Sequence, residues 1–149
     1  MKTFLVPVDL SPVTDKVIET ALDFARAFQG RVALLHIIQP PVVAGGEYTL
    51  PAQIVEETVG YSRKNAEVRL ARHQESLSRA GVESTLNITV GAPVPLILAE
   101  AARTGADYVI MGSHGHGKLY DFLVGSTASG VLKKAPCGVI VIPPADKQG

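Results

Sequence analysis

Short apolar segments alternate along the chain with longer segments in which apolar residues recur at helical spacing. Two apolar segments, Thr3–Val8 and Arg31–Ile38, are nearly continuous runs rich in β-branched residues, which predicts strands covered on both faces. The segment Val82–Val90 instead alternates apolar and polar positions, so we expect a half-buried strand near a sheet edge. Two further strands are predicted over Ala106–Gly112 and Cys137–Pro144.

Four segments between these strands have the pattern and the ends of helices. In the first, Ser11 predicts an N-cap, Pro12 the first helical position and Gly30 the end of the helix. The other helices are expected over Ala52–Ala80, before Gly81, and over Pro95–Arg103 and Ser126–Lys134. The residues between 39 and 51 include many glycines and prolines, which predicts one long loop.

This order of elements predicts the fold class. Strands that alternate with helices indicate an α/β domain, with a parallel sheet, helices on both faces and right-handed crossovers. Ligands of such sheets bind beyond the carboxyl ends of the strands, where the strand order reverses. We therefore expect functional residues directly after the strands, in the segments Pro7–Asp9, His36–Ile38, Val90–Ala92 and Met111–Lys118.

The composition narrows the range of partners. The chain has 149 residues, of which 46% are hydrophobic, so a single domain over residues 1–149 is expected. Its 14 basic and 14 acidic residues cancel, which argues against nucleic acid or an anionic membrane as a partner. The single cysteine, Cys137, excludes an intramolecular disulfide. The start MKTFLVPVDLSP lacks the apolar core of a signal peptide, and no apolar run reaches the ~20 residues of a membrane span, so a cytoplasmic protein is expected.

A glycine-rich segment, MGSHGHGKLY, follows the fourth predicted strand. As far as Lys118 it matches the phosphate-loop pattern G-x-x-x-x-G-K, but Leu119 occupies the position where Ser or Thr would bind Mg²⁺. Gly112 and Gly115 would let the backbone approach a ligand closely, although glycines after a strand are also ordinary turn residues.

A second glycine motif, Gly125-Ser126-Thr127, opens the last predicted helix. Free backbone N–H groups and two hydroxyls at the positive end of a helix dipole suit an anion, so the two motifs together could enclose a triphosphate. Ser126 could also act simply as the N-cap of this helix, a role compatible with phosphate binding.

The spacing G-x2-G-x9-G-S/T, formed by Gly112, Gly115, Gly125 and Ser126, resembles the ATP-binding signature of the universal stress protein family. The N-terminal FLVPVDLSP, with Asp9 at the strand end, is also similar to that family, as are LLHII and TASGVLKKAPCGVIVIP. The resemblance covers essentially the whole chain apart from the segment between residues 42 and 58.

This resemblance implies an open, Rossmann-like, five-stranded parallel sheet in the order 3-2-1-4-5, with strands one and four adjacent at the switch point. It also implies ATP as the ligand, with ADP or AMP as alternatives and with Mg²⁺ accompanying the nucleotide. By the family's pattern, the site residues fall into three groups: the strand end Pro7, Val8 and Asp9 with the backbone of Ile37 for the adenosine end, Met111 and Gly112 for the ribose, and Gly115, Gly125, Ser126 and Thr127 for the phosphates.

Several of these residues have simpler interpretations. Asp9 could cap the first helix. His114 and His116 form an H-x-H pair, but no third metal ligand accompanies them, and we expect both on the surface near phosphate. His36, within an apolar strand, is expected to be a core residue that makes a hydrogen bond. Cys137 has no His or Asp beside it in the pattern of a catalytic thiol.

Three functional hypotheses follow. The first is an ATP-binding regulatory protein of the stress response, with at most weak hydrolysis. The alternative is a slow ATPase or nucleotidyl-transferring enzyme that uses the same crevice, although the sequence offers no obvious Walker B carboxylate. The third is a structural dimer module with a vestigial site. The family resemblance also implies a homodimer through the fifth strand, Val139–Ile142, whose apolar edge favours pairing with another chain.

Overall fold

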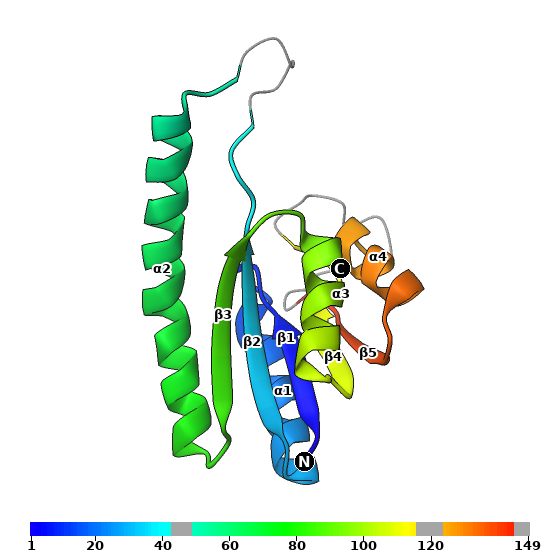
Figure 1. The fold of residues 1–149 in the computed structure, drawn as a ribbon. Coiled ribbons are helices and arrows are strands. Elements are labelled where there is room, and N and C mark those ends of the chain that lie inside the picture. Colours follow the sequence, from blue (N-terminus) through cyan, green and yellow to red (C-terminus); the bar gives the residue numbers. More distant parts are fainter. Residues whose placement is uncertain (43–48, 116–123, 145–149) are drawn as a thin grey trace.

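The computed structural model of this chain describes residues 1–42, 49–115 and 124–144, and its sheet has the predicted topology. Five parallel strands are hydrogen-bonded in the order β3-β2-β1-β4-β5 (Figure 1). Their bounds are Thr3–Pro7 for β1, Arg31–Ile38 for β2, Ser84–Val90 for β3, Tyr108–Gly112 for β4 and Gly138–Ile142 for β5. The predicted α/β fold with order 3-2-1-4-5 is confirmed.

Helices cover both faces of the sheet, and each face has its own apolar core. The helices are α1 (Thr14–Phe28), α2 (Ala52–Arg79), α3 (Pro93–Thr104) and α4 (Ser126–Lys134). On one face Phe4 and Val6 of β1 pack with buried residues of α1 and α2. On the other face Leu5 packs with buried residues of α3 and α4. β1 is therefore buried on both sides, whereas β3 lies at an edge and is only half buried, as its alternating sequence predicts.

The strand order reverses between β1 and β4. The chain passes from β1 to β2 on one side, and it returns later to place β4 on the other side, with Phe4 opposite Tyr108. The carboxyl ends of β1 and β4 consequently lie side by side at one edge of the sheet, where the connections that follow them diverge. Among the described residues, no helix is both long and apolar enough to cross a bilayer.

The start of α1 differs from the prediction that Ser11 is its N-cap. The helix begins at Thr14 with Val13 as N-cap, and no side-chain cap is formed. Ser11 instead lies in a preceding turn, where its carbonyl accepts a hydrogen bond from the Thr14 N–H at 3.0 Å. The reason is a competing acceptor, because Asp9 Oδ1 binds the Ser11 N–H at 3.0 Å and holds the chain in this turn.

The end of α1 also differs from the prediction. Gln29, not Gly30, adopts the left-handed conformation, with φ of 51°, while the Gly30 N–H bonds to the carbonyl of Ala25 at 2.7 Å. Gly30 is required for a different reason, since a Cβ there would lie 2.6 Å from the Lys2 carbonyl oxygen. At the end of α2, Gly81 does take the left-handed conformation, with φ of 80°, as expected of a helix-ending glycine.

Candidate functional site

A cavity of about 320 Å³ opens at the carboxyl ends of β1 and β4. Every site residue predicted from the sequence lines it, although these residues come from four separate parts of the chain. They are Pro7, Val8 and Asp9 after β1, Ile37 of β2, Met111, Gly112, His114 and Gly115 at the end of β4, and Gly125, Ser126 and Thr127 at the start of α4. The fold thus brings the predicted residues together around one space.

The β1 side of the cavity is fixed by backbone contacts with β2. The Val8 N–H donates to the Leu35 carbonyl at 2.9 Å, and the Val8 carbonyl accepts a 2.8 Å hydrogen bond from Nδ1 of His36. His36 is buried, which agrees with the expectation of a hydrogen-bonded core residue. Both backbone polar groups of Val8 are thus hydrogen-bonded, and the next residue, Asp9, lines the cavity with an exposed side chain.

The β4 side of the cavity depends on Gly112. A Cβ at this position would lie 2.8 Å from Cγ1 of Val13, so glycine allows the first turn of α1 to approach the end of β4. The following residue, Ser113, is buried, and its N–H donates to the Ile142 carbonyl at 2.8 Å. Its hydroxyl lies 2.9 Å from Nδ1 of His114. The end of β4 is therefore tied to β5 on one side and to α1 on the other.

The third wall is the N-terminus of α4. Gly125 is the N-cap, and its N–H donates to the Ser113 carbonyl at 2.6 Å, which attaches the helix directly to the loop after β4. Ser126 is the first helical residue and not the N-cap, so the simpler interpretation of Ser126 is wrong. The first turn carries no acidic residue. The positive end of the α4 dipole consequently faces the cavity beside the hydroxyls of Ser126 and Thr127.

The cavity also contains residues that the sequence did not single out. The apolar ones are Val13, Val17, Leu35, Pro93, Ile97 and Ala128. The polar ones are Thr14, Gln39 and Ser113. Gln39 directly follows β2, so the rule that pointed to Asp9 and Gly112 could have included it, and Ser113 lies within the segment Met111–Lys118 that the rule did include. The helix residues carry no such signal, because apolar spacing shows that a helix has a buried face but not what that face contacts.

The ionisable groups of the cavity wall are Asp9 and His114 among the described residues. Within that part of the chain no group of three or more His, Cys, Asp or Glu is arranged to hold a metal ion. His116, Lys118 and Leu119 lie outside the described residues, so the expected surface position of His116 near phosphate stays a prediction. Elsewhere, burial and the nearby Asp107 raise the pKa of the Cys137 thiol, which disfavours a reactive thiolate.

Comparison with known proteins gives a consistent match over most of the chain. The sequence model of the universal stress protein family matches residues 1–143. Universal stress protein A homolog 2 of Coxiella burnetii is 31% identical over 145 residues, which cover 95% of this chain and 94% of that protein. Homolog 1 of the same organism is 29% identical over 143 residues, covering 95% of each.

Solved structures agree with these sequence matches. Universal stress protein UspA from Lactobacillus plantarum superimposes with a TM-score of 0.84 at 26% identity, covering 95% of this chain and 97% of that one. The fold and the sequence therefore point to the same set of relatives.

Proposed function

The chain belongs to the universal stress protein family, and from that premise we propose that it binds an adenine nucleotide, ATP with Mg²⁺, in the cavity between β1 and β4. In this proposal the chain is a cytoplasmic regulatory protein of the stress response. Its regulatory state depends on whether nucleotide is bound, and it hydrolyses ATP weakly at most. The observation that carries the proposal is the cavity itself, in which predicted adenosine, ribose and phosphate residues line one space at the switch point.

The two ends of the cavity suit the two ends of a nucleotide. Leu35, Ile37 and Ile97 supply an apolar surface for a flat base, and the acceptor-only carboxylate of Asp9 suits a hydrogen-bond donor of the adenosine. At the other end the N-terminus of α4, with Ser126 and Thr127, suits the phosphates. In this arrangement Mg²⁺ would be bound mainly through the phosphate oxygens and water.

The glycines at the rim let the segments that form the cavity wall pack closely against one another. A Cβ on Gly125 would lie 3.0 Å from the Ser113 carbonyl oxygen, and a Cβ on Gly115 would overlap the Asp9 carboxylate.

Two solved structures of this fold, 21% and 23% identical to this chain, are complexes with cAMP and dAMP. In those proteins the same architecture therefore accommodates an adenine nucleotide.

Direct binding measurements test the proposal. Nucleotide released from the purified protein would be identified by chromatography, and titration calorimetry with ATP, AMP and adenosine would give the affinities. We expect ATP to bind with millimolar or better affinity. Protein that copurifies with no nucleotide and shows no such affinity would contradict the proposal.

The enzymatic alternative predicts multiple-turnover release of phosphate or pyrophosphate, which Asp9→Ala abolishes. A regulatory protein instead shows release close to the buffer background.

We also propose a homodimer through the outer edge of β5, Val139–Ile142. β5 ends the sheet on the side opposite β3, and on that side no further strand pairs with it among the described residues. An apolar edge strand favours pairing with a second chain. Sedimentation velocity tests this, because a monomer has a mass of 15.7 kDa and a homodimer twice that mass.

A further inference from the structure

Helix α2 has a buried face and an unusual exposed face. Ala66, Leu70 and Leu77 are its buried residues and belong to the core on the α1 side of the sheet. Ile54, Tyr61 and Val68, in contrast, are 46%, 79% and 59% exposed. Figure 1 shows α2 as the outermost element beside β3, with its N-terminal end extending beyond the ends of the strands. A large aromatic and two branched aliphatic side chains therefore face solvent.

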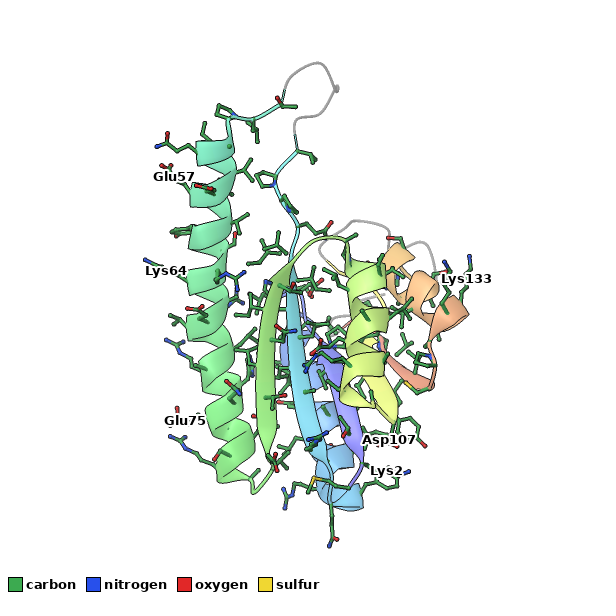
Figure 2. All side chains as sticks on the ribbon, viewed as in Figure 1. Lys2, Glu57, Lys64, Glu75, Asp107 and Lys133 are labelled. Atoms are coloured by element: carbon green, nitrogen blue, oxygen red, sulfur yellow. The ribbon has the colours of Figure 1, made fainter. Side chains whose placement is uncertain are left out.

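The three exposed apolar residues form a line along the helix. They are seven positions apart, which is close to two helical turns, whereas Leu70 follows Tyr61 by about two and a half turns and so points the opposite way. Glu57 and Lys64 fall between them on the same side. Figure 2 shows both of these side chains along the side of α2 that faces away from the sheet. We call the set Ile54, Glu57, Tyr61, Lys64 and Val68 the outer stripe.

The chemistry of the outer stripe is complementary to its own reverse. Read from either end it runs apolar, charged, aromatic, charged, apolar, with the acid and the base exchanged. In an antiparallel pair with a two-fold axis at Tyr61, Ile54 faces Val68 of the second copy, and Glu57 lies within one residue of the position opposite Lys64 of the second copy. A parallel pair in register would place like charges opposite each other.

We propose that a second copy of this chain docks on the outer stripe through antiparallel pairing of two α2 helices. The charges favour a second copy as the partner, because a two-fold interface joins the same surface of both copies and here brings the acid of one copy near the base of the other. The formal net charge of zero adds no overall repulsion between copies. Within each copy the sheet lies on the side of α2 opposite to Glu57 and Lys64 (Figure 2). With three apolar residues per copy, the association is expected to be weak and dependent on protein concentration.

This interface is distinct from the edge of β5. α2 packs beside β3, and β3 and β5 are the opposite edges of the sheet. Substitutions in the outer stripe should therefore leave any pairing through β5 intact. The two kinds of association can be separated by testing the same variants in one assay.

Charge reversal with rescue is the sharpest test. Glu57→Lys and Lys64→Glu, made separately, each create two like-charge pairs and should raise the dissociation constant at least about tenfold in sedimentation equilibrium. The double variant Glu57→Lys with Lys64→Glu restores both pairs and should return to about the wild-type value. Glu67→Lys, an exposed position off the stripe, is the matched control and should have little effect. Circular dichroism would verify that each variant is folded.

A symmetric crosslink provides the second readout. Tyr61→Cys in a Cys137→Ser background should oxidise rapidly to a disulfide dimer, because the two-fold axis brings residue 61 against its own copy. Glu67→Cys in the same background should crosslink much more slowly. The proposal is overturned if wild-type association is absent or insensitive to all the reversals, as it would be for β5 pairing or another occupant. Equal crosslinking rates at positions 61 and 67 would also overturn it.

Discussion

The carboxylate of Asp9, which follows β1, lies directly against Gly115, which follows β4. A Cβ on Gly115 would overlap Asp9 Oδ2, while Oδ1 of the same carboxylate accepts the N–H of Ser11 at 3.0 Å. One oxygen thus holds the turn that leads into α1, and the other faces the loop after β4. Asp9 therefore supports the turn before α1 and also has a place in the cavity wall, but it does not cap the helix, whose N-cap is Val13.

Gly115→Val is predicted to weaken ATP binding by at least about tenfold, a typical effect of misplacing groups in a preformed site. The added side chain has to displace the exposed Asp9 carboxylate and break its hydrogen bond with the Ser11 N–H, so the free energy of unfolding should fall by about 0.5–1.5 kcal/mol. Titration calorimetry and chemical unfolding would measure the two quantities. Gly60→Ala, on α2 and away from the cavity, serves as the control for affinity. Wild-type affinity in Gly115→Val would contradict the proposed place of the nucleotide.

Two helical glycines should respond to alanine in opposite ways. Gly60 lies inside α2, and no neighbouring atom is within 4 Å of the place that a Cβ would occupy, so Gly60→Ala should raise the free energy of unfolding by about 0.5–1 kcal/mol. Gly130 of α4 packs on α3, and a Cβ there would lie 2.8 Å from Cγ2 of Val94. In Gly130→Ala the contact with Val94 should cancel the stabilisation expected of alanine in a helix, and Gly130→Val should lower the free energy of unfolding by about 1–3 kcal/mol. Urea unfolding would check both, and equal effects at the two sites would refute the packing argument.

Ser126→Ala is predicted to weaken binding of ATP but not of adenosine. Its hydroxyl lies at the start of α4, where the proposal places the phosphates, and a hydrogen bond to a charged group is worth about 1.5–3 kcal/mol. Calorimetry with the two ligands would separate phosphate contacts from base contacts. Ser129→Ala, later in the same helix and outside the cavity wall, is the matched control. Equal losses for ATP and adenosine would place Ser126 elsewhere relative to the nucleotide.

Much of the fold follows from patterns that act locally. Continuous apolar runs marked the doubly covered β1 and β2, and alternation marked the edge strand β3. Helix ends were less predictable, because several groups compete for the same backbone atoms. The Ser11 N–H donates a hydrogen bond to Asp9 Oδ1. Glycine is required at position 30 because the chain there lies close to the Lys2 carbonyl, not because it forms a left-handed turn. Such outcomes depend on tertiary neighbours that a single segment does not contain.

The candidate site was predictable where a position in the topology was sufficient. Residues directly after β1 and β4, and the glycine spacing up to Gly125, identified much of the cavity wall. Thr14 of α1 and Ile97 of α3 were missed, because they belong to helices whose packing direction the sequence does not specify. The outer stripe was missed for a related reason. The sequence of α2 does not show which of its apolar residues are covered by the sheet, and only the exposure of Tyr61 shows that apolar residues lie on its outer side.

A buried carboxylate on α3 predicts how stability depends on pH. Glu100 is only 9% exposed, and it accepts hydrogen bonds from Arg103 Nε at 3.0 Å, from Arg103 Nη2 at 2.5 Å and from Asn87 Nδ2 at 3.2 Å. The Arg103 hydrogen bonds lower the pKa of Glu100 below its ordinary value of 4.5, against burial, which acts to raise the pKa. Asn87 belongs to the edge strand β3, so this carboxylate links α3 to the sheet.

Glu100→Gln should therefore destabilise the protein by about 1.5–3 kcal/mol at pH 7, the range for hydrogen bonds to a charged group. Because the folded-state pKa is lowered, the stabilisation by Glu100 is complete above the unfolded-state pKa and is lost as the pH falls through the folded-state pKa. The difference between wild type and variant should accordingly shrink below about pH 4.5. Urea unfolding across this range would measure it. Glu75→Gln, which breaks only the exposed pair with Arg79, should change stability by less than about 0.5 kcal/mol at every pH. A gap between wild type and Glu100→Gln that stays constant down to about pH 3 would mean that packing, not charge, accounts for the effect of Glu100.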